Sequence, residues 1–196
     1  MKYLVKNIND LDDKKYELFL NKLPKEEKEK INKKINPNDK KRSILGLILL
    51  EELLKTDINN IKIKRSKNNK PYIENSNIYF NISHKKDYVT TIISNKKIGI
   101  DIEYINENKI NLNTLKYFST EKEEKSITNS NNLKKLYFTL FSLKESYIKM
   151  NDLLFDKNII EFEIDNDQII NKRNDINIKI IKDIENYIIT ICEENV

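Results

Sequence analysis

Residues 79–103 read YFNISHKKDYVTTIISNKKIGIDIE. They contain the only histidine, His84, and one of only two glycines, Gly99. They also contain two acids separated by a single residue, Asp101 and Glu103. The stretch begins as a short apolar strand that breaks into NISH. It runs from the first half of the chain into the second, and we expect the functional site to depend on it.

The end of this stretch, IGIDIE at residues 98–103, alternates strictly between isoleucine and other residues. Successive side chains of a strand point to opposite faces, so the isoleucines share one face and Gly99, Asp101 and Glu103 share the other. Two neighbouring carboxylates repel each other, and a bound cation would relieve the repulsion. Gly99 would leave room for a ligand. The structural alternative is an ordinary half-exposed strand with its acids in solvent.

A third unusual element lies at residues 141–149, FSLKESYIK, in a segment with helical periodicity. Positions on a helix advance by about 100° per residue, which places Lys144 near the centre of the apolar arc. A lysine at that position is costly unless it snorkels to solvent or meets an anion. Glu145 and Lys149 have the i,i+4 spacing of a surface ion pair, which is the structural alternative to a site.

These segments, FNISH at 80–84, GIDIE at 99–103 and FSLKESYIK at 141–149, resemble the three signature blocks of the Sfp-type 4'-phosphopantetheinyl transferases. Their order and spacing also match. The resemblance covers residues 40–149 well and the two ends only in outline. Phe141 stands where the family usually has tryptophan, a difference that affects packing more than chemistry.

The resemblance implies an enzyme activity. A serine of an acyl, peptidyl or polyketide carrier protein attacks the β-phosphate of coenzyme A. The transfer of phosphopantetheine releases adenosine 3',5'-bisphosphate, with Mg²⁺ as cofactor and Mn²⁺ as a substitute. Such carriers serve fatty acid, polyketide and nonribosomal peptide biosynthesis and are generally acidic. The alternative in the same family is a relative that binds coenzyme A without catalysis.

The resemblance also implies roles for the acidic and basic residues of the second half. Asp101, Glu103 and Glu145 would be ligands of magnesium, which prefers oxygen donors. Glu145 could also accept the serine proton, directly or through water. Lys144 and Lys149 would face the pyrophosphate or the phosphopantetheine arm.

The resemblance also implies that residues in the first half of the chain bind the nucleotide end of coenzyme A. Arg42 is the candidate for the 3'-phosphate, at the start of a helix where anions are already favoured. His84 would contact the same phosphate, and Lys30 is a further contact, although the spacing before Arg42 differs by about a residue from the family's. The implied coenzyme A contacts are Arg42, Lys70, Pro71, Ser83, His84 and Lys30. Solvated charges and a simple turn at Lys70-Pro71 are the structural alternatives.

Residues 117–121, YFSTE, resemble another block of the family, FFS-x-x-E, but the acid comes one place early. Glu121 and Glu123 are both candidates for the missing glutamate, and the sequence does not decide between them.

The order of expected elements is α+β in both halves: a strand, helices, a long helix and then antiparallel strands. This predicts two subdomains, residues 1–97 and residues 98–196, with the carboxylates in the second. The family implies a pseudo-twofold pair of subdomains with coenzyme A and the active site in the cleft between them. The expected strands are 1–8, 61–64, 78–82, 88–94, 98–103, 159–164, 168–170, 176–181 and 187–192. The expected helices are 10–21, 24–34, 40–55, 112–118, 120–127 and 132–150.

Composition excludes several other classes of protein. The 196 residues carry a net charge of +5, but lysines and acids interleave, which argues against a nucleic-acid-binding surface. No apolar run approaches the ~20 residues of a membrane helix, so we expect no membrane segment. A single cysteine, Cys192, fits a reducing cytoplasm and a role in core packing. The length fits the monomeric form of the family.

Overall fold

The structure is a computed structural model that describes residues 1–106 and 110–195. The chain divides into two compact units, Met1–Asn95 and Lys96–Val196, so the division lies two residues before the expected one. Each unit combines helices with antiparallel strands, and the α+β class is therefore confirmed. The pseudo-twofold relation of the halves remains a prediction. None of the helices in the described ranges is long and apolar enough to span a bilayer.

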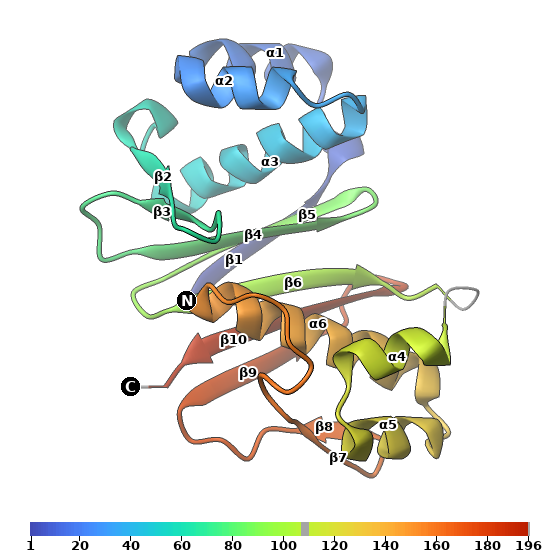
Figure 1. Cartoon of the computed structure of the whole chain (residues 1–196). Helices are drawn as coiled ribbons and strands as arrows, with labels where there is room; N and C mark the ends of the chain where they lie inside the picture. Colours follow the sequence, from blue (N-terminus) through green and yellow to red (C-terminus); the bar gives the residue numbers. More distant parts are fainter. Residues whose placement is uncertain (107–109, 196) are drawn as a thin grey trace. The chain divides into compact units, whose positions relative to one another are not determined.

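The first unit is a three-stranded antiparallel sheet in the order β1-β5-β4, with a long helix, α3, packed against it. Figure 1 shows α3 between this sheet and the two shorter helices α1 and α2. A hairpin of β2 and β3 completes the unit. The elements are β1 (Lys2–Asn7), α1 (Asp13–Lys22), α2 (Lys25–Asn32), α3 (Pro37–Leu54), β2 (Ile63–Arg65), β3 (Pro71–Ile73), β4 (Tyr79–Lys85) and β5 (Tyr88–Ser94).

Helix α3 is the centre of the first core. It begins with Asn36 as N-cap, whose side chain accepts a hydrogen bond from the backbone N–H of Asn38, and with Pro37 in its first turn. It ends at Lys55, which adopts the left-handed conformation with φ of 53°. Residues 44–50 are all buried, because the helix is covered on one side by the sheet and on the other by α1 and α2. A helix that is apolar all round fits such a position.

The second unit repeats the same plan. Its sheet has the order β6-β10-β9, and the long helix α6 packs on β6 and β10. In both units the first strand pairs antiparallel with the last strand, and the last with the one before it. The elements are β6 (Ile98–Tyr104), α4 (Leu112–Phe118), α5 (Glu121–Thr128), α6 (Leu133–Asn151), β7 (Glu163–Asp165), β8 (Gln168–Ile170), β9 (Ile176–Ile181) and β10 (Tyr187–Glu194).

Most expected elements are present, and two expectations need correction. The strand expected at 159–164 begins only at Glu163, because Ile160 and Phe162 enter the core from irregular backbone. Strand β3 was not among the expected strands: Pro71, for which a turn was the structural alternative, begins this strand and is paired with Arg65 of β2. The expected core role of Cys192 is confirmed: the side chain is fully buried, and burial raises the pKa of its thiol to about 12.

Candidate functional site

In the second unit, helix α6 crosses directly over the face of β6 that carries Gly99, Asp101 and Glu103, here named the acidic face. A Cβ atom on Gly99 would lie 1.9 Å from the backbone oxygen of Ser146 and 2.5 Å from the backbone nitrogen of Met150. The glycine therefore permits close approach of helix and strand. The expectation that Gly99 leaves room for a ligand is corrected, because the α6 backbone occupies that room.

Asp101 is 3% exposed, although it lies on a strand with alternating acids. Its Oδ1 accepts a hydrogen bond from Lys149 Nζ at 2.5 Å, and its Oδ2 accepts one from Ser142 Oγ at 2.9 Å. Both donors come from α6, at positions seven residues apart that share one helix face. Residues 98–103 are buried throughout, so the alternative of a half-exposed strand is wrong for β6. The contact between Asp101 and Lys149 is a charge-assisted hydrogen bond that is partly buried.

The other two expected metal ligands lie on the same pair of elements. Glu103 is 7% exposed and follows Asp101 on the acidic face, and Glu145 is half-buried on α6. In the ranges 1–106 and 110–195, no three His, Cys, Asp or Glu side chains are gathered around one point as a metal ion requires. The donor set still has the right chemistry for magnesium, since all three side chains offer carboxylate oxygens.

Lys144 lies on the other side of the helix. Two positions from Ser142 correspond to about 200° of rotation, so Lys144 points away from β6. It is fully buried, and its Nζ donates to Glu123 Oε2 at 2.6 Å and to the backbone oxygen of Lys157 at 2.8 Å. Burial lowers the pKa of the ammonium group, and the hydrogen bond from Lys144 to Glu123 acts against that shift. The lysine thus meets an anion in the core, which corrects its expected position beside the pyrophosphate.

Of the two candidate acids that the sequence left open, Glu123 is the buried one. Its Oε2 accepts from the backbone N–H of Thr120 at 2.8 Å, and Thr120 Oγ1 accepts from the N–H of Glu123, which forms a capping box at the start of α5. Its Oε1 accepts from the N–H of Phe162 at 2.9 Å. Glu121, by contrast, is exposed. Glu123 is therefore the acid that ties α5, α6 and the segment before β7 together.

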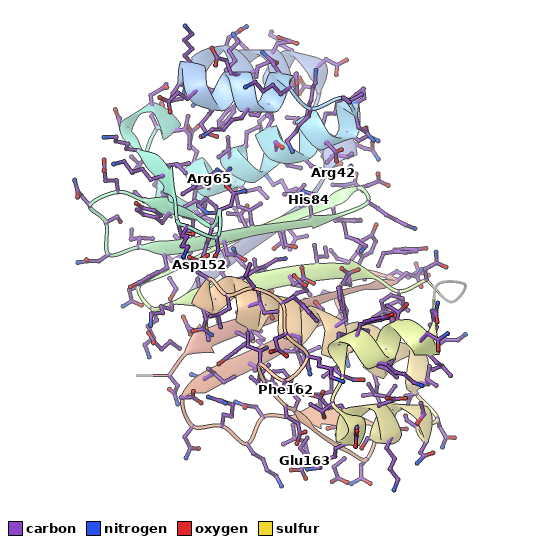
Figure 2. All side chains as sticks on the ribbon, viewed as in Figure 1. Arg42, Arg65, His84, Asp152, Phe162 and Glu163 are labelled. Carbon is purple, nitrogen blue, oxygen red and sulfur yellow. The ribbon has the colours of Figure 1, made fainter. Side chains whose placement is uncertain are left out.

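In the first unit, basic side chains from α3, β2 and β4 line a pocket of about 290 Å³, here named the basic pocket. Figure 2 labels three of them, Arg42, Arg65 and His84. Arg42, Arg65 and His84 come from these three elements. The lining combines apolar side chains, which suit a ring, with cationic side chains, which suit phosphate. The lining residues are Glu27, Lys30, Ile31, Lys34, Arg42, Ser43, Leu47, Ile63, Arg65, Pro71, Phe80, Ile82 and His84.

Arg42 is held in place by two hydrogen bonds. Its Nη1 donates to the backbone oxygen of Lys86 at 2.6 Å, and its Nη2 donates to Asp39 Oδ1 at 2.6 Å. The guanidinium lowers the pKa of the Asp39 carboxyl through this hydrogen bond. Its Nε is buried and has no hydrogen-bond partner among the described residues. A buried donor without an acceptor is costly.

The other expected coenzyme A contacts divide into two groups. Lys30, Pro71 and His84 line the basic pocket, with Lys30 Nζ 2.5 Å from Glu27 Oε1. Ser83 is buried on the opposite face of β4 from His84, because neighbouring residues of a strand alternate, and it does not line this pocket. Lys70 lies just before β3, where its backbone N–H donates to Ser66 Oγ at 3.0 Å.

Two basic residues of the pocket, Lys34 and Arg65, were not predicted. Arg65 reaches the pocket because its strand pairs with β3, where it is the partner of Pro71. The alternating residues 61–64 before Arg65 predicted a strand. Its partner strand begins at a proline, which strands usually disfavour, and the hairpin was therefore not predicted.

Two models of known protein families match the chain. A family model described as "4'-phosphopantetheinyl transferase, N-terminal" matches residues 11–96. A second model, described as "4'-phosphopantetheinyl transferase superfamily", matches residues 97–192. The two matches meet close to the division between the structural units.

Three curated proteins are similar to the chain. The 4'-phosphopantetheinyl transferase gsp of Aneurinibacillus migulanus is 31% identical over 169 residues, which cover 79% of this chain and 70% of that protein. The 4'-phosphopantetheinyl transferase Sfp of Bacillus subtilis (strain 168) is 26% identical, over 71% of this chain and 64% of that protein. A mouse L-aminoadipate-semialdehyde dehydrogenase-phosphopantetheinyl transferase is 27% identical, over 75% of this chain and 54% of that protein.

A basic pocket and a buried carboxylate pair on an α+β scaffold suit a protein that handles phosphate-bearing substrates. The two family models and the similarity to gsp identify the family: the chain belongs to the 4'-phosphopantetheinyl transferase superfamily. It is accordingly a transferase, as its similar proteins are named.

Proposed function

We propose that this protein transfers the 4'-phosphopantetheine group of coenzyme A to a serine of an acyl, peptidyl or polyketide carrier protein, with release of adenosine 3',5'-bisphosphate. Membership of the family supports the reaction type. The observation that carries the proposal is the basic pocket, which is lined by lysine, arginine and histidine side chains. The adenosine end of coenzyme A, with its 3'-phosphate, has the ring and the charge that such a pocket selects.

The carboxylates of the second unit would act at the pyrophosphate end. Asp101, Glu103 and Glu145 would hold Mg²⁺, and when bound the ion would neutralise charge on the pyrophosphate. Lys149 would add a second positive charge there. Glu145, which is half-buried and therefore accessible, would accept the proton of the attacking serine. Positioning and charge neutralisation are the main requirements of phosphate transfer.

The reaction is tested directly by mass spectrometry. The protein is incubated with coenzyme A, Mg²⁺ and an apo-carrier protein, and the carrier is weighed. A mass increase of one phosphopantetheine supports the proposal. Binding of coenzyme A without a change in carrier mass would instead identify a non-catalytic relative.

A first prediction concerns the 3'-phosphate. If Arg42 and His84 bind it, dephospho-coenzyme A should bind at least roughly tenfold more weakly than coenzyme A, since a charged hydrogen bond is worth about 1.5–3 kcal/mol. Isothermal titration calorimetry measures both affinities. In the Arg42→Gln variant the difference between the two affinities should become smaller, because one of the two expected contacts to the 3'-phosphate is lost. Equal affinities in the unchanged protein would remove both residues from this role.

A second prediction concerns the carrier. The chain has a net charge of +5, and an acidic carrier would be attracted to it over long range. Raising the salt from about 0.1 M to 1 M shortens the Debye length from about 10 Å to 3 Å. The KM for the carrier should then rise by roughly tenfold or more, with kcat less affected. Steady-state kinetics at several salt concentrations measure both constants.

The control for this prediction is a carrier whose acids near the modified serine are neutralised, which should lose the salt dependence. A KM that does not respond to salt would contradict electrostatic capture. It would direct attention to apolar contacts on α4, where Tyr117 is 76% exposed and Leu112 is 47% exposed.

A further inference from the structure

A row of buried hydroxyl groups leads from the interior of the second unit to the Asp101 carboxylate. Ser142 Oγ lies 2.9 Å from Asp101 Oδ2 and 2.9 Å from Thr190 Oγ1. Thr190 Oγ1 lies 3.0 Å from Ser146 Oγ. Ser142, Ser146 and Thr190 are all fully buried. The row is formed by α6 and β10, which both pack against β6.

The backbone places these groups in line. Thr190 is the cross-strand partner of Asp101, so both side chains stand on the face of the sheet that α6 covers. Ser142 and Ser146 are four residues apart on α6 and lie one above the other on the helix face toward that sheet. Their small size, together with Gly99, lets the helix approach closely enough for hydroxyl-to-hydroxyl contact.

The direction of the donors follows from proton counting. An ionised carboxylate can only accept, so the single proton of Ser142 goes to Asp101. The Ser142–Thr190 bond then requires the proton of Thr190, which leaves Thr190 as an acceptor toward Ser146. Ser146 is different, because its proton has a second acceptor, the backbone oxygen of Leu143 at 3.0 Å. The order Thr190 to Ser142 to Asp101 is therefore determined, whereas Ser146 is a side branch.

We infer that Ser142, supported by Thr190, is a positioning residue that holds the Asp101 carboxylate in the orientation used for the metal and the pyrophosphate. With Oδ2 bonded to Ser142 and Oδ1 to Lys149, the carboxylate plane is set by two donors from one helix. Partners that orient a ligating carboxylate typically change metal affinity or activity by 10- to 100-fold when removed. This inference rests on the proposed function, because it assigns Asp101 to that site.

The chain offers a matched control for the test. Ser142→Ala removes the donor to Asp101, and Ser146→Ala removes an equally buried hydroxyl on the same helix that also contacts Thr190 but not Asp101. Both variants lose one oxygen atom from the same interior, and the thermal unfolding midpoint of each shows that the variant is still folded. At Thr190, substitution by valine keeps the shape without the hydroxyl, and substitution by serine keeps the hydroxyl.

The experiment measures Mn²⁺ binding in the presence of coenzyme A by electron paramagnetic resonance, and kcat and KM for coenzyme A by carrier mass. We expect Ser142→Ala to weaken Mn²⁺ binding about 10- to 100-fold and to lower kcat, with KM for coenzyme A little changed. Ser146→Ala should stay close to the unchanged protein. Thr190→Val should fall between the two serine variants, and Thr190→Ser should recover most of the loss.

Two other results would distinguish failure of this inference from failure of the proposed function. If the unchanged protein is active and Ser142→Ala matches Ser146→Ala in Mn²⁺ affinity and kcat, the positioning role is overturned and the proposed function stands. If the unchanged protein neither binds Mn²⁺ nor modifies a carrier, the proposed function fails, and the inference fails with it.

Discussion

Replacement of Glu145 by glutamine should lower the rate of phosphopantetheine transfer by about 100- to 10,000-fold, the range expected when a general base is removed. Glutamine keeps the size of the side chain but removes both the negative charge and the basic oxygen. Glu145 is half-buried on α6, outside the second hydrophobic core, so the variant should remain folded. The measurement is the initial rate of carrier modification, with circular dichroism to confirm the fold.

The control for this variant is Glu121→Gln, which makes the same chemical change at an exposed position on α5. It should transfer at nearly the rate of the unchanged protein. Coenzyme A affinity should also be largely retained in Glu145→Gln, because we assign the nucleotide end to the basic pocket of the first unit. A Glu145→Gln protein with near-normal turnover would mean that the motif on α6 is structural and that the base lies elsewhere.

Replacement of Gly99 by alanine should destabilise the second unit by more than about 4 kcal/mol, a loss found only for the most disruptive single substitutions. The added Cβ would lie 1.9 Å from the backbone oxygen of Ser146, and no side-chain rotation can relieve that overlap. The α6 backbone would have to move away from β6, which would also separate the donors of Asp101 from their acceptor. Chemical denaturation monitored by circular dichroism gives the change in free energy of unfolding.

The other glycine provides the comparison. In Gly46→Ala the new Cβ would approach a side chain, with Ile82 Cγ2 at 2.9 Å, rather than a backbone. Alanine also gains about 1 kcal/mol over glycine in a helix interior, which offsets part of that contact. We expect a change of about 1 kcal/mol or less at Gly46. Equal effects at the two glycines would contradict the close approach of α6 and β6.

Periodicity predicted the order of the elements well, because strands and helices bury side chains with distinct repeats. The long helix at 132–150 and the strand at 98–103 lie within one residue of α6 and β6 at each end. Their mutual contact was not predictable from a repeat. The same glycine is compatible with an open space for a ligand and with a crossing helix, and only the packing of α6 distinguishes them.

The long-range partners of charged side chains could not be predicted from the sequence either. The apolar surroundings of Lys144 were evident from the helical arc, but its partner Glu123 lies 21 residues away on another helix. Arg65 was missed for a similar reason, since its place in the basic pocket depends on a short hairpin. Periodic patterns predict which face of an element is buried. They do not predict which charged group will pair with a charged side chain on that face.

The pairing of first and last strands in each unit has a consequence for how the protein folds during synthesis. The partner of β1 is β5, so the first unit can close its sheet once residues 88–94 have left the ribosome. The second unit has to wait for β10, which lies between β6 and β9 and supplies Thr190 beside Asp101. Such non-local pairing slows folding, because a long loop must close before any contact compensates for the lost entropy. The acidic face should therefore mature last, after the basic pocket has already formed on the growing chain.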